Sequence, residues 1–591
     1  MKNHTFFGLA ALVACFYSSA FAADHVHYNI SLVDPGKHLV QVAITIPPGK
    51  SERELQLPVW NALYQVRDFS QFINWIRVEG GGRFTQLNKS RWQITGTENG
   101  GRLQYEVFAD NPGPYGAQLD FHHAFFNLAE ILCYIDDERA SPADVEFNDV
   151  PTGWKIATPL KQEGNVFWAN NYDQLVDSPV EISNFDERDF DSGSAIYRVI
   201  VDSDGASAIL DKIIPSLKRI VAAETSWMND TPFRSYMFIY HFSDLPGDGG
   251  MEHAYGTAIT LPTLDITRNF PRFLEITAHE FFHLWNVKRI RPQSLEPIDY
   301  TKEDYTPALW FSEGVDSTVS EYMLLRAGLL DEHSYLDHLG QELTELEIRT
   351  AHTTQSVEQS SIDAWLEKYP HYNLPARSIS YYNKGELLGV LLDLKMREAT
   401  GDHVSLRDLF QWMNQRYAKN GKFFADSAAV RDTARTLTNA DFDEFFQKYV
   451  SGVDEIPWGV FFSGVGLEVD TNEVTFADPG FQAERNFDQP PTVVEVDAGS
   501  AAERAGLKSG DVIAQINNQR AGRDFAKVLS EIIPGSTVHL RIIREAMQRD
   551  LQWTVGSRQQ KVYRLRDVSD LTARQRSRRA AWLFSDSASS K

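Results

Sequence analysis

The chain has 591 residues, of which 42% are hydrophobic and 12% aromatic. This composition is too apolar for general disorder and suffices for about three packed domains. Lys and Arg number 57 against 81 Asp and Glu, a formal net charge of −24, which argues against a nucleic-acid partner because phosphate backbones attract a surplus of cations.

The first 22 residues are typical of an export signal. Lys2 precedes an apolar run at 6–14, and Ala20-Phe21-Ala22 has the small residues of a cleavage site. We expect cleavage after Ala22 and a bacterial periplasmic location; the alternatives are an extracellular protein or a lipoprotein anchored at Cys15. Cys133 is the other cysteine, so a mature chain starting after the signal forms no internal disulfide. No later segment is long and apolar enough to span a bilayer.

Residues 23–188 have the pattern of a β-rich domain. Apolar and less apolar residues alternate over 40–46, the period of a half-buried strand. Segments 92–97 and 103–108 flank Asn99-Gly100-Gly101, a turn sequence that tolerates positive φ. We expect a hairpin there and a β-sandwich-like N-terminal domain.

Within residues 189–456, strands are expected at 233–242 and near 257–261, and helical periodicity dominates from 271 to about 449. This part is predicted to be mainly helical.

Short strands return in a third unit, residues 457–556, and are expected at 492–496, 512–516 and 537–543. Residues 557–591 are expected to be a C-terminal tail, which is predicted to be poorly ordered from Arg574 onward, where several arginines and then serines follow. The whole chain is therefore expected to be a multidomain α+β protein.

The stretch ITAHEFFHLWN, residues 276–286, carries chemistry. His279 and His283 lie four residues apart on an expected helix, so both imidazoles can reach one ion at about 2.0–2.1 Å. Glu280, offset around the helix, can accept a proton from a metal-activated water. The alternative is a hydrogen-bonded pair of core histidines, which the apolar neighbours would desolvate.

Zinc in such a site takes a third protein ligand and keeps one position open. Glu313, within LWFSEG, is the best candidate, because a carboxylate among bulky apolar residues is poorly solvated unless it is ligated or paired. Its alternative roles are a helix cap or an exposed acid, and Asp316 is a candidate to orient one histidine. We predict one Zn²⁺ per chain on His279, His283 and Glu313.

The joint pattern of HExxH, the following LWNVKRIRP at 284–292, WFSEG at 310–314 and a terminal PDZ-like unit resembles the glycyl aminopeptidases. These are zinc peptidases of the gluzincin group. The resemblance reaches to about residue 555 and implies a β-rich N-terminal domain, a thermolysin-like catalytic domain and a C-terminal PDZ domain.

Two further sites follow from the resemblance. Glu252, in Gly249-Gly250-Met251-Glu252-His253, matches the glutamate that binds the substrate's free amino group, and Gly249 and Gly250 would let backbone approach the substrate. Tyr382, before Asn-Lys-Gly, matches the tyrosine that stabilises the tetrahedral intermediate and is preferred to Tyr381. The alternatives are a turn with a solvated acid and a core tyrosine.

The terminal unit resembles PDZ domains of bacterial proteases over residues 499–513. Residues 464–467, GVGL, are expected to form a loop that receives a peptide's C-terminus. An insertion at 478–491 departs from the PDZ pattern, so packing on the catalytic domain is the alternative role. The basic run Lys288, Arg289 and Arg291 is predicted to be a solvated face with no catalytic role.

The resemblance implies a zinc aminopeptidase that hydrolyses the first peptide bond of peptides with a free N-terminus and favours Gly or Ala there, and the signal-like first 22 residues predict that it is exported. Glu280 is the expected general base. A thermolysin-like zinc endopeptidase and a noncatalytic PDZ scaffold remain alternatives. The intact set of His279, Glu280, His283 and Glu313 favours an enzyme.

Overall fold

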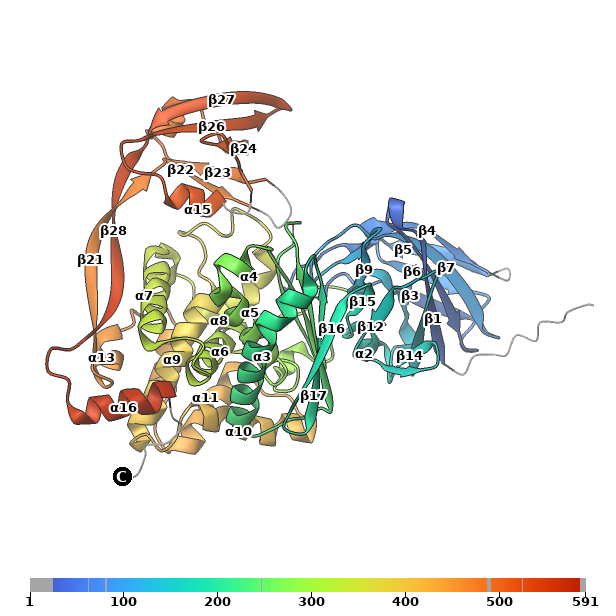
Figure 1. The fold of residues 1–591 in the computed structure, drawn as a ribbon, viewed down its shortest axis with the longest axis horizontal. Coiled ribbons are helices and arrows are strands. Elements are labelled where there is room, and N and C mark those ends of the chain that lie inside the picture. Colours follow the sequence, from blue (N-terminus) through green and yellow to red (C-terminus); the bar gives the residue numbers. More distant parts are fainter. Residues whose placement is uncertain are drawn as a thin grey trace, which may run out of the picture.

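The computed structural model describes residues 25–61, 63–79, 82–245, 247–485, 490–522 and 525–584. The chain forms a β-rich N-terminal part, a helical centre and a C-terminal β part (Figure 1). The expected export signal lies outside the described residues. Among the residues described, no helix combines the length and apolar character that crossing a membrane needs.

The N-terminal part is a layered β domain, as predicted. Its sheets share one core, which includes Val42, Leu55, Ile94 and Tyr105. A seven-stranded sheet runs in the order β13 (Lys161–Glu163), β14 (Val166–Ala169), β11 (Ala143–Asn148), β1 (Val26–Asp34), β2 (Leu39–Ile46), β7 (Gly101–Phe108) and β4 (Ile73–Val78). Two four-stranded sheets run β10 (Tyr134–Ile135), β3 (Glu52–Gln56), β6 (Arg91–Thr95), β5 (Arg83–Asn88) and β12 (Lys155–Ala157), β15 (Val180–Ser183), β9 (His123–Phe126), β8 (Ala117–Leu119). The short helices are α1 (Leu128–Ile131) and α2 (Tyr172–Val176).

The predicted hairpin around Gly100 is wrong. β6 pairs with β3 and β5, whereas β7 pairs with β2 and β4 in the other sheet. Gly100 does adopt a positive φ of 89°, but the turn carries the chain from one sheet to the other. The residues of the turn therefore determine that the chain bends here, but they do not determine which strands pair.

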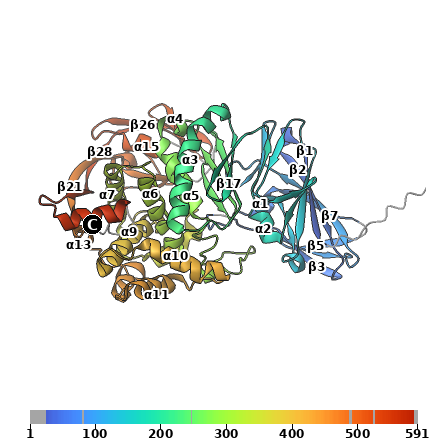
Figure 2. The same ribbon diagram turned by 60° about the horizontal axis from the view of Figure 1, so that its bottom comes forward.

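The centre contains a five-stranded sheet covered by helices. The sheet runs β16 (Asp186–Ser192), β17 (Ala195–Asp202), β18 (Ser235–Phe242), β20 (Gly256–Leu261), β19 (Gly249–His253). β16 begins before the boundary expected at residue 189 and belongs to this sheet. The helices are α3 (Ala206–Met228), α4 (Asp265–Arg268), α5 (Phe270–Phe282), α6 (Val315–Arg326), α7 (Glu332–Ile348), α8 (Val357–Ile362), α9 (Tyr381–Thr400), α10 (Leu406–Arg416), α11 (Asp426–Thr438), α12 (Asp443–Phe445) and α13 (Trp458–Ser463). The N-terminal part adjoins the centre in both ribbon views (Figure 2).

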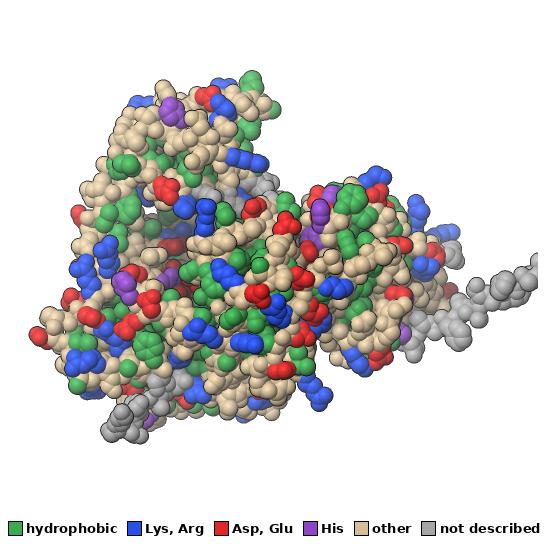
Figure 3. All heavy atoms as spheres, viewed as in Figure 1, with side chains coloured by type: hydrophobic (Ala, Val, Ile, Leu, Met, Phe, Trp, Pro, Cys, Tyr) green, Lys and Arg blue, Asp and Glu red, His purple; other side chains and the backbone are tan. Residues whose placement is uncertain are grey.

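The C-terminal β part lies over one side of the centre, and a notch separates it from the N-terminal part (Figure 3). A long ribbon of β21 (Leu467–Asp478) and β28 (Gly556–Asp567) joins it to the body. Its six-stranded sheet has its own core and contains β22 (Phe481–Glu484), β23 (Thr492–Val496), β24 (Val512–Ile516), β25 (Gln519–Arg520), β26 (Thr537–Arg544) and β27 (Met547–Thr554), with α14 (Ala501–Arg504) and α15 (Phe525–Ser530).

Residues 557–584, the described part of the expected tail, are folded, and the poor order predicted from Arg574 is wrong as far as Phe584. They complete β28 and form α16 (Ala573–Phe584). The side chain of Trp582 is fully buried and its indole nitrogen donates to the Tyr322 hydroxyl at 2.6 Å. Burial of an aromatic ring with a satisfied N–H fixes this helix on the catalytic core.

The GVGL loop does not serve as an open carboxylate loop. Leu467 begins β21 in the ribbon, outside the six-stranded sheet. The Arg579 guanidinium of α16 donates to the carbonyls of Val465 and Gly466 at 2.9 and 2.6 Å. The predicted loop is therefore covered by the C-terminal helix.

Candidate metal centre and active site

Three predicted ligands converge at the C-terminal end of α5. The Nε2 atoms of His279 and His283 lie 3.0 Å apart. The Glu313 Oε2 atom lies 3.5 Å from the first and 3.3 Å from the second. Donors about 2.0–2.1 Å from a tetrahedral zinc ion stand about 3.3 Å from one another. The donor set and its spacing therefore fit zinc.

A local irregularity positions Glu313. It lies on a π-helical turn, Trp310–Gly314, which precedes α6. The Asn286 amide donates to the carbonyls of Phe311 and Ser312 at 3.0 and 3.2 Å, which ties this turn to the end of α5. A Cβ on Gly314 would lie 2.5 Å from the Gly385 Cα, so glycine is required where the turn meets α9.

Asp316 lies on the opposite side of the two imidazoles. Its carboxylate oxygens are 3.3 Å from the His279 Nδ1 atom and 3.4 Å from the His283 Nδ1 atom. The His283 Nδ1 atom also donates to the Asn286 carbonyl at 2.9 Å. Partners on Nδ1 leave the Nε2 lone pairs free for a metal. The sequence analysis predicted that Asp316 orients one histidine, whereas the structure places its carboxylate beside both.

The charges around the histidines favour a cation. Burial raises the pKa of Glu280 to about 8 and that of Asp316 to about 7. Burial also acts on Glu313, but the imidazoles of His283 and His279 lower the pKa of this carboxyl to about 2. A divalent ion would stabilise the ionised carboxylates and keep the imidazoles deprotonated.

Glu280 faces the backbone of strand β19. Its Oε2 atom is buried without a hydrogen-bond partner in the described part of the chain. A Cβ on Gly250 would lie 2.3 Å from the Glu280 Oε1 atom, and one on Gly249 would lie 2.3 Å from the Tyr115 hydroxyl. Both glycines therefore make room for other side chains of the site, a role that the sequence did not reveal.

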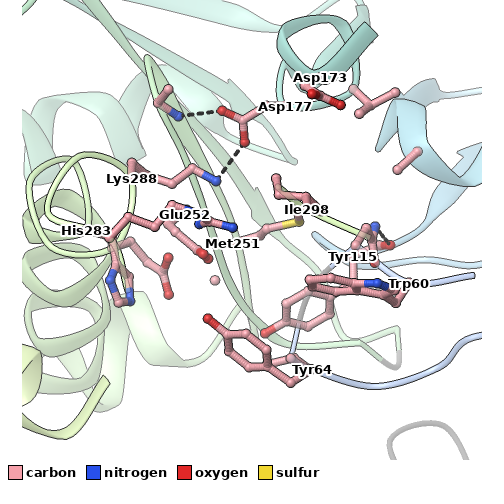
Figure 4. Close-up of a pocket in the computed structure, with 18 of the residues that line it drawn as sticks. Trp60, Tyr64, Tyr115, Asp173, Asp177, Met251, Glu252, His283, Lys288 and Ile298 are labelled. Atoms are coloured by element: carbon pink, nitrogen blue, oxygen red, sulfur yellow. Dashed lines mark hydrogen bonds and ion pairs between the residues drawn. The ribbon is translucent and has the colours of Figure 1, made fainter. Parts of the chain in front are cut away.

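One cavity of about 670 Å³ collects the predicted residues. Its lining includes His279, His283, Glu313, Glu280, Tyr382, Glu252, Gly249 and Gly250. Glu252 and His283 point into the same space (Figure 4). The Tyr382 ring lies 6.2 Å from the His279 ring, while Tyr381 is buried and does not line the cavity.

The N-terminal part supplies the far wall of this cavity. Trp60, Tyr64 and Tyr115 face the metal-ligand side across the open space (Figure 4). Sequence reasoning missed all three, because they lie in loops whose only signal is an aromatic side chain between strands. The cavity is therefore built from both parts of the chain.

The basic run is not a solvated face. The side chain of Lys288 is 15% exposed and pairs with Asp177 of the N-terminal part at 2.7 Å. The Arg289 guanidinium donates to the carbonyls of Leu284 and Ala254 at 2.6 and 3.1 Å. Buried cations need partners, and the partners of these two side chains connect the segment after α5 to neighbouring parts of the cavity wall.

Comparisons with known proteins agree with this architecture. The family model described as M61 glycyl aminopeptidase matches residues 272–388, that of the peptidase M61 N-terminal domain matches 27–184, and that of a PDZ domain matches 492–544. A crystal structure of an aminopeptidase N family protein from Idiomarina loihiensis is 26% identical, with a TM-score of 0.78 over 94% of this chain and 100% of that one.

Two further matches are more limited. The M1 zinc metallopeptidase from Deinococcus radiodurans is 15% identical, with a TM-score of 0.46 over 73% of this chain and 94% of that one. A probable periplasmic serine endoprotease, DegP-like, from Rhizobium meliloti (strain 1021) is 34% identical over 67 residues. That match spans 11% of this chain and 13% of the relative.

Proposed function

Because the chain belongs to the M61 glycyl aminopeptidase family and is a metallo-aminopeptidase, we propose that it releases the first residue of peptides with zinc bound by His279, His283 and Glu313. The supporting observation is that Glu252 and the three ligands line one cavity. A carboxylate fixed near the metal would hold the substrate's ammonium, so that the first peptide bond lies over the ion. The noncatalytic-scaffold alternative does not hold.

The residues around the ion divide the chemistry. Zinc, when bound, polarises the scissile carbonyl and acidifies a water. Glu280 accepts the proton of the attacking water and passes it to the leaving amine. Tyr382 donates a hydrogen bond to the oxygen that gains negative charge, which stabilises the transition state more than the ground state. Trp60, Tyr64 and Tyr115 exclude water from the N-terminal side of the cavity.

Three finer features of this function are also proposed. The family description, glycyl aminopeptidase, supports a preference for Gly as the first residue, and the proposal includes Ala as the next smallest side chain. The signal-like pattern of residues 1–22 supports export, with a periplasmic location. The PDZ match supports peptide binding by the C-terminal part. Since α16 covers the GVGL loop, we assign such binding to the six-stranded sheet.

The first experiment measures hydrolysis of a panel of aminoacyl reporters and short peptides, with free or acetylated N-termini. Free amines are expected to be cleaved, acetylated ones are expected to resist, and a chelator is expected to abolish the activity until zinc is restored. A thermolysin-like endopeptidase would instead cleave acetylated peptides as fast as free ones. Activity that persists through complete removal of the metal would contradict the proposed centre.

Replacing Tyr382 with Phe is expected to lower kcat by about 10²-fold with little change in KM, since one oxyanion donor is lost. Tyr381→Phe is the matched control, because the Tyr381 side chain is next in sequence to Tyr382 but does not line the cavity. Steady-state kinetics on an alanyl reporter separates the two. An unchanged kcat in Tyr382→Phe would remove Tyr382 from the mechanism.

A further inference from the structure

A second group of metal-type ligands lies where the N-terminal part meets the central sheet. His123 is on β9 and Glu181 on β15, while Asp202 is on β17 and His241 on β18. Backbone pairing fixes their placement, because Asp202 lies opposite His241 in the central sheet. On the N-terminal side, β15 and β9 are adjacent antiparallel strands. The four side chains thus come from two parts of the fold.

Their donor atoms have the spacing found at the catalytic centre. The Glu181 Oε2 atom is 2.9 Å from the His241 Nε2 atom and 3.7 Å from the His123 Nδ1 atom. The His123 Nδ1 atom is also 3.4 Å from the Asp202 Oδ2 atom. The corresponding separations among His279, His283 and Glu313 are 3.0–3.5 Å. The three separations of the second group lie near the distance of about 3.3 Å between ligands of a tetrahedral zinc. One donor atom each of His123, Glu181 and His241 lies within 4.8 Å of the other two, and Asp202 meets this group through His123.

No Lys or Arg side chain pairs with the two carboxylates of this group in the described chain. Glu181 is 0% exposed, and its Oε1 atom and the His123 Nδ1 atom have no hydrogen-bond partner in the described chain. Within the ranges described, the ion-pair partners of Glu181 and Asp202 are imidazoles alone, with no Lys or Arg. Two carboxylates with neutral imidazoles carry two negative charges, which one divalent cation neutralises.

We propose that His123, His241, Glu181 and Asp202 bind a second Zn²⁺, which joins the N-terminal part to the catalytic part. Four protein ligands leave no open position, so the site is structural. The Ser183 hydroxyl donates to the Asp202 Oδ1 atom at 3.0 Å and orients the carboxylate. The competing arrangement is a proton on His123 that pairs with both carboxylates.

The site lies on the elements that shape the cavity. The strand of Glu181 follows Asp177, which pairs with Lys288 at the cavity wall. On the other side, His241 pairs with Thr260 of β20, and Thr260 pairs with Gly249 of β19. An ion here fixes the separation of the two walls while remaining distinct from the reaction centre.

Zinc content distinguishes the two arrangements without reference to activity. The full chain is stripped with a chelator, reloaded with zinc, desalted and measured by mass spectrometry of the metal. Wild type is expected to hold two ions, His241→Gln one, His283→Gln one, and the double variant none. His338→Gln is the matched control and is expected to keep two, because it removes a histidine from a different buried group that contains Glu321 and Glu386.

One ion in wild type, with no change in His241→Gln, overturns the proposal, as does loss of the second ion in His338→Gln alone. If His241→Gln does not fold, Glu181→Gln and Asp202→Asn replace it, with circular dichroism as the folding check. Co²⁺ loading of His283→Gln gives a second readout. Intense visible bands of a four-coordinate ion are expected, and their absence overturns the proposal.

Discussion

Glu280→Gln is expected to lower kcat by about 10³-fold while the zinc content stays at the wild-type level. The amide preserves the shape of the side chain but cannot accept the proton of the attacking water, and proton transfer by a positioned base contributes about 10²–10⁴-fold. The buried Oε2 atom has no hydrogen-bond partner in the described chain, so it is available for that proton. Turnover of an alanyl reporter and metal analysis on the same sample measure both quantities.

Glu275→Gln is the matched control, because Glu275 lies five residues earlier on the same helix and does not line the cavity. It is expected to retain most of the turnover. A Glu280→Gln protein that has lost its zinc would show that Glu280 acts through the metal site, and near-normal turnover would exclude it as the base.

Glu252→Ala is expected to lower kcat/KM for substrates with a free N-terminus by about 10³-fold. Removing one partner of a largely buried charge pair costs about 2–5 kcal/mol or more, and 1.4 kcal/mol corresponds to tenfold. Acetylated peptides lack the ammonium, so their slow cleavage is expected to be unchanged. The free-to-acetylated ratio of kcat/KM, measured on one peptide sequence, isolates this contribution from general damage to the site.

Asp173→Asn provides the comparison for Glu252, since Asp173 is a carboxylate on the N-terminal wall of the same cavity. The free-to-acetylated ratio of kcat/KM in Asp173→Asn is expected to stay close to that of wild type. If Glu252→Ala lowers kcat/KM equally for the free and the acetylated peptide, then Glu252 supports the fold of strand β19 and does not select the amino terminus.

The local chemistry of the site was predictable because it depends on helical spacing. His279 and His283 are one turn apart wherever they lie on a helix, so their convergence required no knowledge of the fold. Glu313 was predictable from its apolar setting, but the π-helical turn that aims it was not. That turn depends on the close contact of Gly314 with Gly385, which only the packed structure reveals.

Long-range pairing accounts for the errors. The bend at Gly100 was predicted correctly, but the pairing of the two strands that flank it was not. Strand pairing depends on which side chains are buried against residues that are distant in the sequence. The C-terminal helix was missed because its arginines obscured the short apolar stretch of Ala581, Trp582 and Leu583, which the catalytic core buries. The aromatic wall of Trp60, Tyr64 and Tyr115 likewise becomes visible only when two parts of the chain meet.

The way the PDZ part is attached has a consequence for engineering. The chain leaves the peptidase through β21, traverses a unit with a separate core, and returns through β28 to α16. The unit is thus an insertion, closed at its base by a ladder that runs from Leu467 opposite Asp567 to Asp478 opposite Gly556. A short turn that joins two paired residues of this ladder could therefore replace the whole module, while the preceding part of β21 and the following part of β28 stay attached to the peptidase.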